Sequence, residues 1–396
     1  MEIRFARRTF LHAIAAQLAV ASADSSWFRA SAAEPTAARH PFSWDRVPVY
    51  VDTGKSSGFT HEEAQFLATH YSFLSLEKGQ GIEPYGSTEA GAAAAIKQLK
   101  EINPRIKVLF YWNSVLDYVN LYKATRGGLP DTFFLKRLNG KPYDVRPGVR
   151  PYDLSNPAMR AWWLENAIKN VEDGNFDGIF VDAIPQIADG ASRLAKLVGP
   201  QKAMALQAGL SRMLKELQMR LGSTKIILFN GLRFDPDGWK DGGLSFLRDT
   251  SGAMIEHFGF RASATPERMA GDIELARACA RRGKITIFKG WPTFNWLDNQ
   301  EVLHQPHDVI HARAAHDITF PLACFLVAAG VYSYFDYSWG YRLDMGALDW
   351  YPEFQKPLGP PRNEAIRHQY TYHREFAHAS VYVNLMRKQA KITWRG

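Results

Sequence analysis

The segment Phe176-Asp-Gly-Ile-Phe-Val-Asp182 decides the fold class of this chain. Its centre is continuously apolar, and it ends abruptly in a carboxylate. A run of this kind is typical of a strand buried on both faces, as the strands of parallel sheets are. Residues 157–173 before it carry apolar positions at helical spacing, with Asn156 placed to cap the helix and Gly174 to end it. The pattern predicts a helix and then a buried parallel strand with Asp182 at its end.

The same unit of strand and helix recurs along the chain. Short apolar runs predict eight strands, at residues 47–51, 71–76, 106–112, 176–181, 225–229, 252–255, 284–288 and 331–335. Helical periodicity predicts helices at residues 61–69, 88–102, 157–173, 200–221, 266–282 and 307–329. Eight such units predict an α/β fold, a (β/α)8 TIM barrel over residues 44–340. The alternative is an open doubly wound sheet, which the absence of a glycine-rich phosphate loop disfavours.

Residues 341–396 follow the predicted barrel. The runs at 379–385 and 390–394 predict two strands of a small C-terminal β extension. A segment of this length cannot bury a core of its own, so we expect it to pack on the barrel.

Composition excludes several classes of protein. With 46% hydrophobic residues in 396, the chain is globular rather than disordered or collagenous. The net charge of +8 is spread along the chain without a basic, aromatic-interleaved stripe, so we expect no nucleic-acid partner; an acidic polymer fits this charge better. No apolar run long enough to span a membrane occurs after the N-terminal region. Cys279 and Cys324 exclude a disulfide-rich scaffold and are predicted to be buried free thiols.

Residues 1–32 have the pattern of an export signal. Arg7-Arg8-Thr-Phe-Leu11 precedes the apolar run 13–21, and Ala30-Ser-Ala32 suits a cleavage site. The paired arginines indicate the twin-arginine route and hence a periplasmic or secreted protein. An ordinary secretory signal or an uncleaved anchor is the alternative.

Polar side chains end seven of the eight predicted strands. They are Asp52, Glu77, Asn113, Asp182, Asn230, Glu256 and Asp336. Active sites of TIM barrels lie at the carboxyl ends of the strands, so the set predicts a functional mouth. The alternative for any one of them is an ordinary cap or turn residue.

Two of these carboxylates form a candidate catalytic pair. Glycoside hydrolysis needs one ionised carboxylate, as nucleophile or base, and one protonated carboxyl group, as acid. Asp182 ends the most apolar strand and is the predicted nucleophile or base. Glu256 is the predicted acid, because its apolar neighbours should raise its pKa, although His257 could perturb it. The alternative for Glu256 is a structural ion pair with Arg233 or Lys289.

Aromatic rings near the strand ends suggest platforms for sugars, whose apolar faces pack on such rings. Among these rings are Trp296 and Tyr337. The residues predicted to contact substrate are Asp52, Glu77, Tyr111, Trp112, Asn113, Asp153, Asn230, His257, Trp291, Tyr334 and Asp336.

The motifs together resemble a known group of enzymes. Phe176 to Asp182, preceded by Asp153-Leu-Ser-Asn-Pro157 and Trp162-Trp163, is similar to TIM-barrel glycosyl hydrolases, and most of all to hypothetical glycosyl hydrolase family fifteen. The α-galactosidase and endo-polygalactosaminidase barrels are more distantly similar. The resemblance spans residues 44–396 and implies that Asp182 is the nucleophile or base. Its partner in these relatives follows strand five or six. Strand five here ends in Asn230-Gly231, so the acid role falls to Glu256.

The sequence therefore predicts an exported glycoside hydrolase of a polysaccharide or oligosaccharide that retains anomeric configuration and uses no cofactor or metal. Two alternatives remain. One is a carbohydrate-binding barrel without catalytic activity. The other is a metal-dependent hydrolase, because His307 and His311 are spaced like the zinc ligands of a helix, but with Asp308 in place of the usual glutamate.

Overall fold

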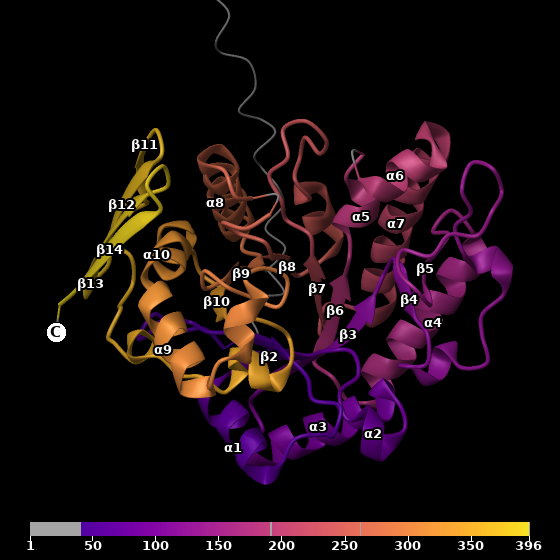
Figure 1. Cartoon of the computed structure of the whole chain (residues 1–396), viewed down its shortest axis with the longest axis horizontal. Helices are drawn as coiled ribbons and strands as arrows, with labels where there is room; N and C mark the ends of the chain where they lie inside the picture. The colour runs from indigo at the N-terminus through magenta and orange to yellow at the C-terminus, as the bar shows by residue number, and fades with distance from the viewer. Residues whose placement is uncertain (1–40, 191, 262, 396) are drawn as a thin grey trace, which may run out of the picture. The chain divides into compact units, whose positions relative to one another are not determined.

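The computed structural model describes residues 41–190, 192–261 and 263–395. Its centre is an eight-stranded parallel sheet in the order β1-β2-β3-β6-β7-β8-β9-β10 (Figure 1). The bounds are β1 Val51–Thr53, β2 Phe73–Leu76, β3 Lys107–Asn113, β6 Gly178–Asp182, β7 Ile226–Asn230, β8 Gly252–Ile255, β9 Ile285–Gly290 and β10 Ser333–Tyr337. The predicted TIM barrel is confirmed.

Hydrogen bonds between the first and last strands close the sheet. The Tyr50 amide donates to the Phe335 carbonyl at 2.9 Å, and the Phe335 amide donates to the Pro48 carbonyl at 2.8 Å. The predicted first strand, 47–51, is assigned only from Val51, apart from an isolated bridge at Val49. Pro48 has no amide hydrogen, so regular pairing cannot run through it.

Helices surround the strands. Their bounds are α1 His61–His70, α2 Ile82–Tyr85, α3 Thr88–Ile102, α4 Pro157–Asp173, α5 Pro185–Ala188, α6 Arg193–Val198, α7 Pro200–Leu221, α8 Pro266–Arg281, α9 His307–Asp317 and α10 Thr319–Ala328. The predicted caps form: the Asn156 side chain accepts from the Ala158 amide, and that of Thr265 from the Arg268 amide. Both helices then start with proline, whose missing amide hydrogen costs nothing there.

The single helix predicted at 307–329 is wrong, because α9 and α10 are separated at Ile318. Pro321 cannot donate to the carbonyl of Asp317, and its ring would clash with that carbonyl in a continuous helix. The break therefore follows from the position of one proline.

Side chains alternate between two apolar layers. One layer fills the barrel interior and includes Phe73, Leu109, Phe180, Leu228 and Met254. The alternate residues of the same strands pack outward against the helices. Because the strand period is two, each inward position is followed two residues later by another inward position nearer the carboxyl end.

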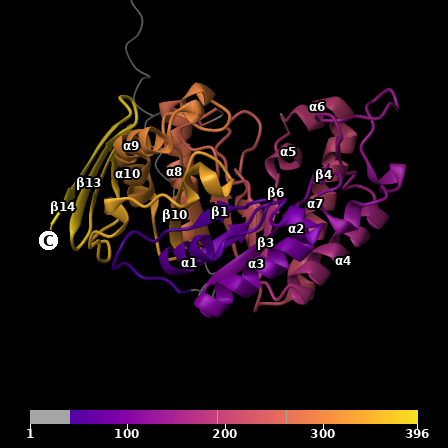
Figure 2. The same cartoon turned by 60° about the horizontal axis from the view of Figure 1, so that its bottom comes forward.

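Two small antiparallel sheets accompany the barrel. After β3, strands β4 (Leu116–Tyr118) and β5 (Val149–Pro151) form a hairpin within the long segment 115–153. At the C-terminus, β11 (Ile366–His368), β12 (Thr371–Glu375), β13 (Ala379–Asn384) and β14 (Gln389–Trp394) form a sheet beside α10 (Figures 1 and 2). Buried Arg374 ties this sheet to α10, because its guanidinium donates to the Leu326 carbonyl at 2.8 Å and also to the Ala329 carbonyl.

Cys279 and Cys324 are buried free thiols, as predicted. Within the described ranges, none of the helices has the length and apolar character needed to cross a membrane.

Candidate active site

The alternation of the strands places polar residues at the carboxyl end of the barrel. Each of four residues lies two positions after an interior apolar or aromatic side chain: Asn113 after Tyr111, Asp182 after Phe180, Asn230 after Leu228 and Glu256 after Met254. They are therefore the first inward positions beyond the apolar core, where a polar side chain can reach solvent or substrate.

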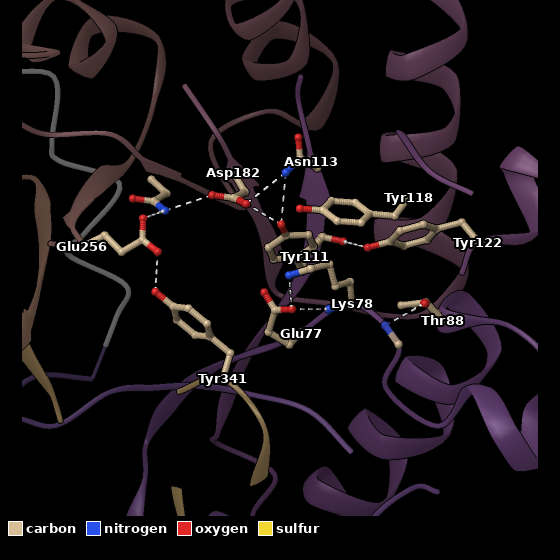
Figure 3. Close-up of polar contacts among 12 residues, drawn as sticks. Glu77, Lys78, Thr88, Tyr111, Asn113, Tyr118, Tyr122, Asp182, Glu256 and Tyr341 are labelled. Carbon is tan, nitrogen blue, oxygen red and sulfur yellow. Dashed lines mark hydrogen bonds and ion pairs between the residues drawn. The ribbon is translucent and has the colours of Figure 1, made fainter. Parts of the chain in front are cut away.

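Asp182 is held by three neighbouring side chains. Its Oδ2 accepts from the Tyr111 hydroxyl and, at 3.0 Å, from Asn113 Nδ2 (Figure 3). The Asn113 amide is oriented because its Oδ1 accepts the backbone amides of Val115 and Leu116. These donors fix the orientation of the carboxylate, as a nucleophile or base requires.

The Asn230 side chain joins the two candidate catalytic carboxylates. Its Nδ2 donates to Asp182 Oδ1 at 2.9 Å and to Glu256 Oε2 at 2.8 Å. Because both bonds share one nitrogen, these two carboxyl oxygens are at most about 5.7 Å apart. Retaining glycosidases have carboxyl groups about 5–5.5 Å apart, and inverting ones about 6.5–9.5 Å.

Glu256 has its own set of donors. Tyr341 donates its hydroxyl to Oε1 (Figure 3), and His257 Nε2 lies 3.2 Å from Oε2. The Trp291 indole donates to the Glu256 backbone carbonyl at 2.6 Å. Neither Arg233 nor Lys289 forms the alternative structural ion pair: Lys289 Nζ instead contacts Asp336 at 2.8 Å.

The expected rise in the Glu256 pKa is wrong. Burial does raise the pKa of this carboxyl, but His257 and the hydrogen bonds from Tyr341 and Asn230 outweigh burial and hold it below its ordinary value. The pKa of His257 is itself lowered, chiefly by burial, so the ring is largely neutral at pH 7. The hydrogen bonds from Tyr341 and Asn230, unlike the charge of His257, favour ionised Glu256 whether or not the histidine is protonated.

We expect Tyr341→Phe to shift the pH profile of kcat/KM. The hydroxyl favours ionised Glu256, so its loss should raise the carboxyl pKa and, for an acid catalyst, move the basic limb to higher pH. Tyr85→Phe, at a half-exposed ring on α2, is the control. A shift of the acidic limb instead would make Glu256 the group that must be ionised, and an unchanged profile would remove Tyr341 from this role.

A cleft of about 1440 Å³ opens over the pair. Its lining includes the predicted residues Asp52, Glu77, Tyr111, Asp182, Asn230, Glu256, His257 and Trp296. The volume exceeds the roughly 300–1,000 Å³ typical of small-molecule pockets. An extended ligand therefore fits this cleft better than a single sugar.

Charged groups line the floor of the cleft beside the pair. Lys78 Nζ contacts Glu77 at 2.6 Å and lies 4.7 Å from the Tyr111 ring centroid. Burial raises the pKa of Glu77, and the Lys78 ammonium partly offsets this. Burial, with Glu77 and Asp336 nearby, raises the pKa of Asp52 well above its ordinary value. Asp52 therefore has a greater tendency to hold a proton, and a protonated carboxyl can donate to a sugar hydroxyl.

Six predicted contact residues do not line the cleft, and one of them, Asn113, contacts Asp182 instead. Trp112 points outward from β3 and packs on Tyr122, because it alternates with inward Tyr111. Tyr334 lies one layer deeper in the barrel interior.

The remaining three predicted contact residues, Asp153, Asp336 and Trp291, also lie outside the cleft lining. Asp153 pairs with Lys202 at 2.6 Å, and Asp336 is fully buried against Lys289. Trp291 supports the site from behind, because it donates to the Glu256 backbone carbonyl and packs against the rings of Tyr341 and His257. Direct substrate contact by these five residues is not supported by their positions, whereas Asn113 acts through Asp182.

The two histidines that suggested a metal site, His307 and His311, contact an aspartate instead. His307 Nε2 and His311 Nδ1 lie 3.2 and 2.5 Å from the oxygens of Asp349, away from the cleft lining. In the described part of the chain, no three His, Cys, Asp or Glu side chains are grouped to hold a metal ion.

Sequence reasoning missed Tyr341 and Lys78. Lys78 directly follows the strand-end residue Glu77, so its position was available in the pattern. Tyr341 lies four residues after β10 in an irregular segment, where no periodicity gives its direction.

A (β/α)8 barrel with two carboxylates across its mouth is the architecture of a large class of glycoside hydrolases. The model of hypothetical glycosyl hydrolase family 15 matches residues 100–380, and the chain belongs to this family. It is thus a glycoside hydrolase.

Solved structures with a similar fold are distant in sequence. A noncanonic maltogenic α-amylase from Thermotoga neapolitana is 11% identical, with a TM-score of 0.49 and 86% of each chain covered. An Anoxybacillus α-amylase is 10% identical, with a TM-score of 0.48 and coverage of 90% of this chain and 97% of that one. A GH36 α-galactosidase from Geobacillus stearothermophilus is 9% identical, with a TM-score of 0.46; 88% of this chain covers 50% of that one. No curated protein sequence matches the chain.

Proposed function

We propose that this protein hydrolyses a polysaccharide or oligosaccharide with retention of anomeric configuration, Asp182 serving as nucleophile and Glu256 as acid and then base. The observation that carries the proposal is the Asn230 amide between the two carboxylates, which limits their nearest oxygens to about 5.7 Å. That spacing is close to the roughly 5–5.5 Å of retaining enzymes and suits direct attack by Asp182 better than activation of a water.

The reaction proceeds in two displacements. First, an Asp182 oxygen bonds to the anomeric carbon while the glycosidic bond breaks and the leaving oxygen takes the proton of Glu256. Then a water attacks the same carbon and gives its proton to Glu256, and the bond to Asp182 breaks. The free sugar and the original enzyme result.

The hydrogen-bond donors around Asp182 and Glu256 suit the two carboxyl groups to different roles. Tyr111 and Asn113 hold one Asp182 oxygen, so that the carboxylate keeps its orientation during attack. Glu256 must be protonated for the first step, yet its pKa is lowered in the free enzyme. We therefore expect an acidic optimum for kcat/KM, since the protonated fraction falls as pH rises through that pKa.

Proton NMR of the first-formed product tests the proposal. We expect a product with the same anomeric configuration as the substrate, observed before mutarotation. An inverted product would contradict the nucleophilic role and make Asp182 a base that activates water.

We also propose that the protein is exported by the twin-arginine route to the periplasm or beyond. The basis is the sequence of residues 1–32, which lie outside the described residues. Replacing Arg7 and Arg8 with lysines should leave the precursor inside the cell, as measured by fractionation and immunoblotting. The control for a paired basic substitution is the conversion of Lys97 and Lys100, on α3, to arginines. Normal export of the Arg7 and Arg8 variant would contradict the twin-arginine route.

A further inference from the structure

Four arginines line one arc of the cleft. Arg146 comes from the segment between β4 and β5, Arg193 from the start of α6, Arg233 from the loop after β7 and Arg261 from the loop after β8. These segments follow the consecutive barrel strands β3, β6, β7 and β8, which also supply Asp182 and Glu256. The arc that carries the catalytic pair therefore also carries the arginines.

Among the residues that the structure describes, no salt bridge is formed by any of these four guanidinium groups, although the charge of Arg233 helps to lower the pKa of Glu256. Arg146 instead donates to the Tyr118 hydroxyl at 3.0 Å, and Arg193 and Arg261 lie over the rings of Tyr143 and Phe260. Most of their donors thus remain available.

The opposite arc of the cleft differs. Its three basic side chains are each paired with a carboxylate: Lys55 with Glu63 at 2.8 Å, Lys78 with Glu77 at 2.6 Å, and Arg342 with Asp344 at 2.9 Å. The unpaired positive charge of the cleft is therefore concentrated beside the catalytic pair rather than spread around the rim.

A neutral sugar chain in this arc would cover the arginines without supplying their counter-charge, which costs free energy. A chain that carries carboxylate or sulfate groups would supply it, because the planar guanidinium matches these anions with two parallel hydrogen bonds. The net charge of +8, of which residues 1–32 supply only +2, would also favour the encounter of the exported chain with an acidic polymer.

We infer that the substrate is an acidic polysaccharide whose negative groups pair with Arg146, Arg193, Arg233 and Arg261. This inference rests on the proposed glycosidase function and specifies its substrate class. Carboxylate and sulfate groups share the required chemistry, so the test includes both.

The test compares polymers that differ only in charge. Wild-type hydrolysis is measured on a panel of polyuronates, on their carboxyl-reduced neutral forms, and on sulfated and desulfated galactans. Binding is measured by affinity electrophoresis in the Asp182→Asn background, alone and with Arg146→Gln or Arg233→Gln. Arg105→Gln, an exposed residue just before β3 at the opposite end of the barrel, is the control.

We expect cleavage or binding of charged polymers only, and we expect salt to weaken the binding. Each cleft substitution should reduce the affinity about fivefold, and Arg105→Gln should leave the affinity unchanged. Equal cleavage of charged and neutral forms, with no effect of the arginine variants, would overturn the inference while the glycosidase function stands. Arginine-dependent binding without cleavage by the wild type would support the inference and overturn the glycosidase proposal. No binding of any charged polymer would overturn the inference.

Discussion

Asp182→Asn is expected to lower kcat by about 10⁴-fold or more on every substrate that the wild type hydrolyses. An amide cannot form the glycosyl ester or activate a water, yet it has almost the same size as the carboxylate. One side-chain oxygen remains at this position, so it can still accept hydrogen bonds from some of the surrounding donors Tyr111, Asn113 and Asn230. The substitution should therefore lower kcat without lowering the stability of the fold. Steady-state kinetics measure the first, and thermal unfolding of the purified protein measures the second.

Asp173→Asn is the matched control, because this carboxylate is exposed at the end of the helix that precedes the Asp182 strand. It should keep wild-type kinetics. Azide added to Asp182→Gly gives a second readout: attack by azide on the anomeric carbon should restore bond cleavage and yield a glycosyl azide of the opposite configuration. Full activity of Asp182→Asn would exclude the nucleophilic role.

Glu256→Gln should lower kcat/KM about 10²–10⁴-fold on substrates with a poor leaving group. On activated aryl glycosides kcat/KM should fall by less than about tenfold, because such leaving groups depart without a proton. The split between the two substrate types is the measured quantity, since a merely structural defect would lower both.

Glu267→Gln, at an exposed position in the first turn of α8, is the control and should leave both values unchanged. Equal losses on the two substrate types in Glu256→Gln would remove Glu256 from the acid role. The acid would then have to be sought among the buried carboxyl groups of the cleft floor, of which Asp52 and Glu77 have raised pKa values.

The barrel was predictable because its signals are local. Continuous apolar runs, helical periodicity and proline or asparagine at helix starts each depend on a few neighbouring residues. The strand-end polar residues were predictable for the same reason, and the common direction of parallel strands brings them to one mouth. Even the outward direction of Trp112 was implicit in the chain, because it alternates with Tyr111.

The pKa of Glu256 was not predictable, because it depends on groups far apart in the chain. Its apolar neighbours in sequence, Met254 and Ile255, suggested a raised value. The structure adds the Tyr341 hydroxyl, 85 residues away, and the Asn230 amide, 26 residues away. His257 and these two hydrogen bonds together reverse the direction that burial alone would give to the pKa of Glu256.

The sequence by itself determined the architecture and the level in the barrel at which the carboxylates of Asp182 and Glu256 lie. Both follow from the local periods of strands and helices. Only the tertiary structure decided the distance between the carboxylates, the donors that surround them, and the pairing of charges around the cleft. These depend on the closure of the barrel and on the paths of irregular loops, which bring together side chains that no local pattern relates.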